Sequence, residues 1–113
     1  GKAAIARPGT DLTLISYSWA MQEALAAAPR LAADGIDAEV LDLRSIVPLD
    51  TATLLDSVGR TGRAIVVHAA IEFAGFGAEI AAILQKRLWG RLKAPVERVG
   101  ARYTPVPFAL ELE

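Results

Sequence analysis

The chain has 113 residues, of which 53% are hydrophobic and 22% are charged, a balance typical of one globular domain with one core. Lys and Arg number 12 against 13 for Asp and Glu, and neither sign is clustered, which argues against nucleic acid or an anionic membrane surface as a partner. There are no cysteines, so disulfides, thiolate metal sites and a cysteine nucleophile are excluded. Uncharged apolar runs are far shorter than the ~20 residues that span a bilayer, and we predict a cytoplasmic protein.

The sequence opens with Gly1-Lys2-Ala3 and has no initial methionine, so we expect a segment excised from a longer chain. No repeat, low-complexity tract or linker-like stretch interrupts it. We therefore treat residues 1–113 as a single domain whose last part, residues 103–113, is an extended tail.

Short apolar runs bounded by turn signals predict four strands, at residues 12–15, 38–43, 64–67 and 96–99. The run at 64–67 is apolar at every position, which is typical of a central strand covered on both faces. Residues 3–7, before the turn at Pro8 and Gly9, predict an additional edge strand.

The first interval between strands has helical spacing. The predicted inner face of this helix carries Met21, Ala24, Leu25, Ala28 and Ala32. Asp34 and Gly35 supply the stop signal. Pro29 falls inside the helix and removes one backbone hydrogen bond, so we expect a bend there.

Two further helices follow the same logic. In the second, Asp50 is a good N-cap and Gly59 or Gly62 ends the helix, with Leu54, Leu55 and Val58 facing inward. The third presents Phe76, Ile80, Ile83, Leu84 and Leu88 along one face. Strands that alternate with helices predict an α/β domain with a mainly parallel sheet and right-handed crossovers.

The tail contains Thr-Pro-Val-Pro-Phe at 104–108, and two prolines in three residues predict an irregular path outside the sheet. Apolar side chains on such a segment need a surface to cover them. We expect an interface, with the domain itself or with a neighbour, formed by Tyr103, Val106, Phe108 and Leu110.

His68 is the first candidate for chemistry, because ligands bind at the carboxyl ends of parallel strands and His68 follows the run at 64–67. Glu72 and Glu79 lie close enough in sequence to pair with it in a crevice. The plainer interpretation, which we favour, is a structural histidine whose ring is hydrogen-bonded to backbone at the end of a buried strand. One histidine and loosely spaced acids make neither a metal site nor a catalytic triad.

The segment Gly75-Phe-Gly77-Ala-Glu79 follows a strand and opens a helix, as a phosphate-binding loop would. Ile80 replaces the third glycine of the dinucleotide fingerprint. Glu79, expected in the first helical turn, would repel a phosphate. We therefore favour close packing of helix on sheet over nucleotide binding.

Three other features have simple interpretations. Asp42 and Arg44 point to one side of their strand, which predicts an exposed ion pair. Trp19 and Trp89 are candidates for anchoring a partner, and core or rim packing is at least as good an interpretation of each.

Six collinear blocks carry a resemblance to a known family: Gly1-Lys-Ala3, DLTLISY at 11–17, VLDLRS at 40–45 with PLD at 48–50, VVH at 66–68, GFGAEI at 75–80 and TPVPF at 104–108. Over essentially the whole chain they resemble the C-terminal domain of the β subunit of thiamine-diphosphate-dependent 2-oxoacid dehydrogenases, of the pyruvate, branched-chain and acetoin types. The resemblance implies a transketolase C-terminal-like, three-layer α/β fold. Its sheet is expected to have five strands, mainly parallel, with one antiparallel edge strand near 3–7.

The resemblance also implies where the chemistry lies. In that family thiamine diphosphate and magnesium bind between two other domains, and the Gly-Asp-Gly of the metal and diphosphate motif is absent from this sequence. We therefore assign this segment no catalytic, cofactor or metal residues. The complete enzyme is expected to decarboxylate a 2-oxoacid and pass the acyl group to a lipoyl acyltransferase core. This domain would pair with a second β subunit, adjoin the α subunit and dock to that core.

Two positions depart from the family. Ser18 and Trp19 stand where a glycine usually follows the tyrosine that matches Tyr17, and Ala69 replaces a glutamate after His68. The family also continues into a last helix beyond the position of Glu113. Two alternatives stay open: the C-terminal domain of a transketolase or deoxyxylulose-phosphate synthase, and a free-standing α/β module that binds a small ligand beside His68.

Overall fold

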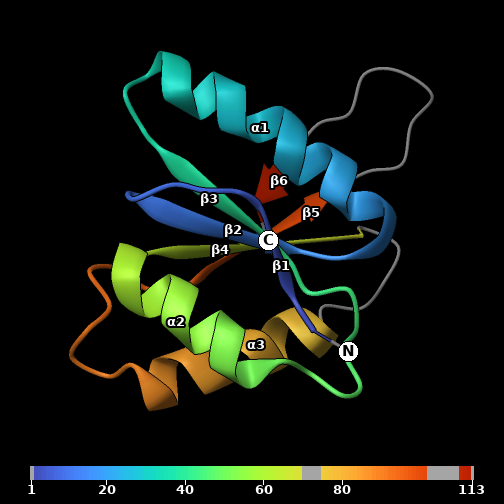
Figure 1. Cartoon of the computed structure of the whole chain (residues 1–113), viewed down its shortest axis with the longest axis vertical. Helices are drawn as coiled ribbons and strands as arrows, with labels where there is room; N and C mark the ends of the chain where they lie inside the picture. The colour runs from blue at the N-terminus through green and yellow to red at the C-terminus, as the bar shows by residue number, and fades with distance from the viewer. Residues whose placement is uncertain (1, 70–74, 102–109, 113) are drawn as a thin grey trace.

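The computed structural model describes residues 2–69, 75–101 and 110–112 of the chain. One sheet carries the strands in the order β1-β3-β2-β4-β5-β6, with helices on both faces (Figure 1). The strands are β1 (Ala4–Arg7), β2 (Leu12–Ser16), β3 (Ala38–Asp42), β4 (Ala64–Ala69), β5 (Glu97–Ala101) and β6 (Leu110–Leu112). The helices are α1 (Met21–Ala33), α2 (Thr51–Thr61) and α3 (Gly75–Arg87), with a 3₁₀ turn η1 (Ser18–Ala20) before α1.

The predicted fold class is confirmed. The inner strands β3, β2, β4 and β5 are parallel, and β1 pairs antiparallel with β3 at one edge. The first five strands therefore form the expected mixed sheet.

A sixth strand, β6, extends this sheet at the opposite edge. It pairs antiparallel with β5, Ala101 lying opposite Leu110. The prediction that the tail stays outside the sheet is thus wrong for Leu110–Leu112. The two prolines, at 105 and 107, precede this strand, so all three of its residues keep a backbone N–H for the ladder.

Alternate residues of each inner strand feed two cores, one on each face of the sheet. Figure 1 shows α1 on one face and α2 with α3 on the other. On the α1 face, buried Leu14 and Val67 meet the alanines of the helix. On the opposite face, Ile15 and Val66 pack against apolar side chains of α2 and α3, among them Leu54, Val58, Ile80 and Leu84.

The inner stripe of α1 is rotated from the predicted one. Its buried residues are Met21, Glu23, Ala24, Ala27 and Ala28. Leu25 is 42% exposed and Ala32 is exposed, so both assignments to the inner face are wrong. Small alanines let the helix lie close to the sheet, and residues on the flank of the stripe then fall outside the contact.

Both ends of α2 are as predicted. The Asp50 carboxylate caps it by accepting from the backbone N–H of Thr53 at 3.1 Å and from the Thr53 hydroxyl at 2.6 Å. It also accepts from the backbone N–H of Ala3 at 3.0 Å, which ties the start of β1 to the helix. These hydrogen bonds, that from the Thr53 hydroxyl foremost, hold the pKa of Asp50 below its usual value. Gly62 ends the helix at φ 77°, a left-handed conformation that glycine adopts without strain.

None of the helices in the described part of the chain is long and apolar enough to cross a membrane.

We predict that Gly9→Ala unfolds the amino end of the sheet. A methyl group at Gly9 would overlap the backbone of Ala38 and Glu39, which is fixed in β3 and cannot yield. The free energy of unfolding in urea should fall by about 3 kcal/mol, the upper range for overpacking. Gly75→Ala is the matched control, because no atom lies within 4 Å of the added methyl group. A Gly9→Ala variant as stable as its control would contradict the close backbone approach.

Candidate functional site

The strand order places a topological switch point between β2 and β4. The chain leaves β2 through α1 toward β3, and leaves β4 through α3 toward β5 on the other side. In open parallel sheets, ligands bind outside the carboxyl ends of strands at such a point. Here those ends carry Ser16 and Tyr17 from β2 and His68 from β4.

Ser16 ties the two strands together at this point. Its hydroxyl donates to the carbonyl of Val67 at 2.7 Å, and its own carbonyl accepts from the backbone N–H of Leu43 at 2.9 Å. The Ser16 hydroxyl is therefore bound to backbone, which gives this serine a structural role.

Three rings stack edge to face above these strand ends. The Tyr17 and Phe76 centroids are 4.9 Å apart with an interplanar angle of 79°, and those of His68 and Phe76 are 6.1 Å apart at 89°. Such geometry is the favourable one for aromatic pairs. Phe76 stands at the start of α3, so this contact fixes the helix against the carboxyl ends of both strands.

His68 lies inside β4, which runs to Ala69, and it is 2% exposed. Its Nδ1 lies 3.0 Å from the Ala69 carbonyl oxygen. A carbonyl oxygen only accepts, so Nδ1 carries a proton and donates it. A ring that is buried and held to backbone favours the structural interpretation, and the role of His68 stays a prediction.

The carboxylates proposed to join His68 are differently placed. Glu79 is exposed in the second turn of α3, and the expectation that it lies in the first turn is wrong, because the helix already begins at Gly75. Glu72 lies outside the described residues. No group of three or more His, Asp or Glu among the described residues could hold a metal ion. Gly77 is buried against the sheet, where a methyl group would lie in ordinary contact, 3.6 Å from His68 Cδ2.

Ser18 explains one departure from the family pattern. Its φ is 60°, in the left-handed region that glycine occupies at little cost and that other residues occupy at about 1 kcal/mol or more. The chain turns there from β2 into η1. Glycine is favoured at this position because it adopts a left-handed backbone conformation without strain. Ser18 makes the same turn at a cost in backbone strain.

The predicted ion pair between Asp42 and Arg44 is not the contact found. The Asp42 carboxylate instead accepts from the backbone N–H of Arg44 at 2.9 Å, with Arg44 at φ 61°. The carboxylate closes a turn at the end of β3, which brings the Arg44 backbone, and not its guanidinium, to the carboxylate.

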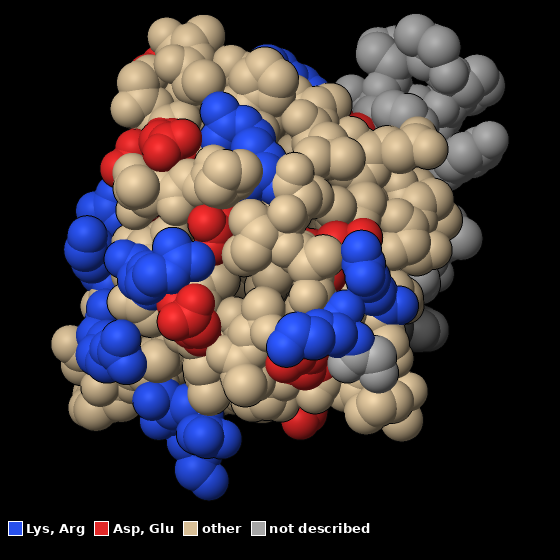
Figure 2. Space-filling model, viewed as in Figure 1, with Lys and Arg blue, Asp and Glu red and all other residues tan. Residues whose placement is uncertain are grey.

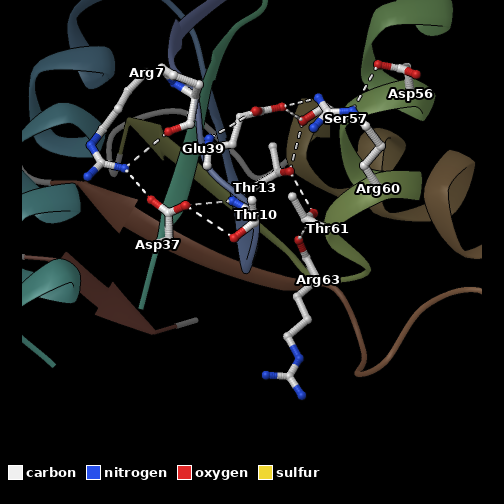
Figure 3. Close-up of polar contacts among 12 residues, drawn as sticks. Arg7, Thr10, Thr13, Asp37, Glu39, Asp56, Ser57, Arg60, Thr61 and Arg63 are labelled. Atoms are coloured by element: carbon white, nitrogen blue, oxygen red, sulfur yellow. Dashed lines mark hydrogen bonds and ion pairs between the residues drawn. The ribbon is translucent and has the colours of Figure 1, made fainter. Parts of the chain in front are cut away.

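The opposite, amino end of the sheet holds a polar cluster that the sequence analysis missed (Figure 3). Glu39 on β3 is 2% exposed, yet its carboxylate accepts three hydrogen bonds. They come from the Gly9 backbone N–H at 3.2 Å, the Ser57 hydroxyl at 2.7 Å and the Arg60 guanidinium at 2.6 Å. The hydrogen bond to Glu39, followed by that to Asp56, raises the pKa of Arg60. The signal in the sequence was a glutamate between two apolar residues, Ala38 and Val40, in the predicted strand.

Hydroxyl groups continue this cluster toward β2. The Thr13 hydroxyl lies 2.9 Å from those of both Ser57 and Thr61, and all three residues are fully buried. Because Ser57 donates its only proton to Glu39, it must accept from Thr13. The cluster is satisfied by protein groups alone, so we assign it to the stability of the fold.

Glu23 on α1 is a second buried carboxylate, 1% exposed, and neither of its oxygens has a hydrogen-bond partner among the described residues. Burial raises its pKa, and Arg30, whose guanidinium lies 3.7 Å from Oε1, opposes that shift. The folded state therefore holds this proton more tightly than the unfolded chain. The charge of Glu23 weakens the fold increasingly as the pH rises above the ordinary value of 4.5.

The two tryptophans differ in burial. Trp19 packs partly buried against the α1 core, whereas Trp89 is 87% exposed, so core packing is excluded for Trp89. Of the predicted interface residues, Tyr103, Val106 and Phe108 lie outside the described part of the chain, and Leu110 opens β6.

Comparison with known families matches residues 1–113 to the family described as Transketolase, C-terminal domain. The chain belongs to this family. A pyruvate dehydrogenase E1 component subunit beta of Rickettsia felis is 45% identical over 113 residues, covering 100% of this chain and 35% of that protein. A 2-oxoisovalerate dehydrogenase subunit beta of Pseudomonas aeruginosa is 46% identical over 110 residues, 97% of this chain and 31% of that protein.

Among solved structures, one described as a split gene transketolase, inactive beta4 tetramer, superposes with a TM-score of 0.74 at 28% identity. The match covers 91% of this chain and 33% of that one. This transketolase C-terminal domain thus spans about a third of the length of the curated relatives that it matches. The resemblance deduced from the sequence is confirmed.

We predict that His68→Gln lowers stability and spares catalysis in the full polypeptide that carries this domain. Loss of a buried ring and its backbone hydrogen bond should cost about 1–2 kcal/mol, seen as a lower thermal midpoint. Turnover measured on the folded fraction should stay within about tenfold of the parent. Glu79→Gln, an exposed neighbour on α3, is the control and should change neither quantity. A His68→Gln protein that melts like its parent and loses more than about a hundredfold in turnover would instead identify an acid–base catalyst.

Proposed function

We propose that this chain is an assembly domain of the β subunit of a 2-oxoacid dehydrogenase. The observation that carries the proposal is sequence identity near 45% along the whole chain with β subunits named for pyruvate and 2-oxoisovalerate dehydrogenases. The complete enzyme would decarboxylate a 2-oxoacid with thiamine diphosphate and magnesium, and transfer the acyl group to the lipoyl group of an acyltransferase core. A cytoplasmic location belongs to the same proposal.

The geometry at the switch point supports a role in assembly over a role in chemistry for this segment. His68 is buried beneath Phe76, and the Ser16 hydroxyl is bound to backbone. A general base or nucleophile must come within hydrogen-bond distance of the reacting atoms. Burial of His68 and the backbone hydrogen bond of Ser16 make such an approach by a substrate unfavourable. In the complete enzyme, thiamine diphosphate and magnesium would then be held by residues outside this chain.

Assembly would involve a second β subunit, an α subunit and the acyltransferase core. The solved relative described as a tetramer of β chains supports association between chains of this type. On this chain, a groove of about 190 Å³ between α1 and the sheet is lined mainly by apolar side chains, among them Leu14, Leu31, Ile65 and Val99. We place the β–β contact on this helix face together with the tail residues Tyr103, Val106, Phe108 and Leu110.

A second candidate is the C-terminal domain of a transketolase, which the solved structure of a split gene transketolase favours. The identity to that structure is 28%, against 45% for the pyruvate dehydrogenase subunit. Both candidates share the cofactor and the fold. They differ in substrate, a 2-oxoacid in one case and a sugar phosphate in the other.

The proposal predicts that residues 1–113 by themselves do not bind thiamine diphosphate. Titration calorimetry with thiamine diphosphate and magnesium should show no saturable heat, and the chain should not turn over pyruvate or 2-oxoisovalerate. The complete α and β assembly is the positive control. Saturable binding by the isolated chain with a dissociation constant below about 100 μM would contradict the assembly role.

The proposal also predicts self-association through a two-fold interface, because two identical β subunits meet across an axis through one self-complementary patch. Sedimentation of the chain at a concentration near 100 μM should show a dimer. Val106→Ser with Phe108→Ser should weaken it at least about tenfold. These substitutions test the interface more specifically than removal of residues 104–113, because that deletion would also remove β6.

Val47→Ser is the control for this experiment, since Val47 is an apolar side chain that is 89% exposed and distant in sequence from the tail. It should leave the dimer unchanged. A parent chain that stays monomeric at millimolar concentration would refute the interface.

A further inference from the structure

A surface groove that the proposed function does not use lies at the amino end of the sheet, opposite the switch point. A groove of about 470 Å³ follows the C-terminal end of α3 and leads into β5. Trp89, Leu92, Ala94 and Pro95 supply its apolar walls, and Gln85 and Lys93 line its rim. The helices run antiparallel to the strands, so the groove lies at the opposite end of the sheet from His68 and Tyr17.

Trp89 is the most conspicuous residue of this groove. It is 87% exposed, although tryptophan carries more apolar surface than any other side chain. Its neighbour Leu88 is 3% exposed and anchors the turn in the core, which leaves Trp89 pointing outward. A rigid exposed tryptophan beside an apolar depression is the usual anchor of a protein interface.

Cations flank this tryptophan in the sequence. Lys86, Arg87, Arg91 and Lys93 are exposed and fall within eight residues that contain no acid. The expectation that neither charge sign is clustered is therefore wrong for this segment. Figure 2 shows Lys and Arg side chains gathered at the left and bottom of the view, toward the end where α2 and α3 finish in Figure 1.

These four cations differ from three arginines elsewhere on the surface. Arg7, Arg30 and Arg60 each pair with a carboxylate, at 3.2, 3.7 and 2.6 Å. Within residues 2–69, 75–101 and 110–112, by contrast, no carboxylate pairs with the four cations beside Trp89. Lys86 and Arg87 lie in the last turn of α3, where they complement the helix dipole. That role leaves Arg91 and Lys93, beyond the helix, without explanation.

Gly59 of α2 and Gly62, which follows this helix, hold the segment in place. The Lys93 backbone N–H donates to the Gly62 carbonyl at 2.7 Å, and its side-chain carbons lie 3.0 Å from where a Gly62 Cβ would stand. The Arg91 guanidinium donates to the Gly59 carbonyl at 3.4 Å and would meet a Gly59 Cβ at 2.8 Å. The stems of both cations thus lie on α2 where side chains are missing. A charged groove that is already ordered loses little entropy on binding.

We propose that this groove binds an acidic segment of a partner protein, with an apolar side chain against Trp89 and a carboxylate on Lys93. The cations that adjoin the groove in sequence, Arg87 among them, add to the positive potential that attracts this segment. An apolar floor with a cationic rim is complementary to such a segment and to little else. Nucleic acid fits less well, because binding of single strands relies on several stacked aromatic rings, whereas Trp89 is the one large exposed aromatic side chain among residues 2–69 and 75–101. The proposal does not depend on the dehydrogenase assignment.

The experiment uses the full polypeptide that carries this chain, in its assembled form. The probe is a fluorescein-labelled peptide in which glutamates flank a pair of leucines, and a peptide with lysines in place of the glutamates is its control. We expect saturable binding of the acidic peptide alone, weakening as salt is raised. Trp89→Ala and the pair Arg87→Glu with Lys93→Glu should each reduce affinity more than about tenfold.

Matched variants separate these effects from damage to the fold. Trp89→Phe keeps an aromatic ring and should retain binding within about threefold. Lys2→Glu with Arg44→Glu reverses the same number of charges away from the groove and should leave affinity unchanged.

Three results would overturn the proposal. The first is equal affinity of the parent and the Trp89→Ala or charge-reversed variants for the acidic peptide. The second is preference for an oligothymidylate probe, with the same dependence on Trp89. The third is a Trp89 shielded from acrylamide quenching in the assembled polypeptide before any peptide is added, which would mean that the rest of that polypeptide already fills the groove.

Discussion

The structure depends on the satisfaction of one buried charge. Glu39 stands at the amino end of β3, buried in the sheet, where an unpaired carboxylate would cost several kcal/mol. Its hydrogen-bond donors come from the turn between β1 and β2, from a serine of α2 and from an arginine on the same helix. The donors thus lie on two separate stretches of backbone, so β3 pairs correctly only when both the turn and α2 are in position. The Glu39 carboxylate therefore favours one arrangement of the elements at the amino end of the sheet. The parallel register of the strands then fixes the positions of their carboxyl ends.

Local signals predicted most of this fold. The period-two and period-3.6 patterns, the cap at Asp50 and the left-handed stop at Gly62 each act within a few residues, and the structure agrees with them. The residues that were misjudged depend on packing between elements. Leu25 and Ala32 were assigned to the core by spacing alone, whereas the direction in which α1 crosses the sheet is set by its alanines. β6 could not be predicted from the sequence, because three residues after a proline-rich segment are too short for a strand pattern. They form a strand because the edge of β5 is available for pairing.

The candidate site shows the same division. The sequence placed His68 near the carboxyl end of a buried strand, although it ended that strand at residue 67 and β4 runs to Ala69. The stacking of Tyr17 and Phe76, which are far apart in the chain, depends on α3 folding back over the sheet. Trp89 could not be placed from sequence, since its exposure depends on the direction in which the turn after α3 leaves the core. The two ends of the sheet consequently serve different purposes: covered aromatic rings close one, and unpaired cations with an exposed tryptophan occupy the other.

The pairing of β6 with β5 bears on how this chain is made. A ribosome synthesises β2, β3, β4 and β5 before it reaches Leu110, so the nascent parallel sheet has an unpaired edge for the time needed to add the intervening residues. An open edge of this kind is a template for pairing with another chain. Glu97 at the start of β5 and Gly100 near its end weaken that template while it is exposed, since neither residue favours strand formation. Pairing of β6 with β5 thus closes the exposed edge and ends the period of synthesis in which the sheet could pair with another chain.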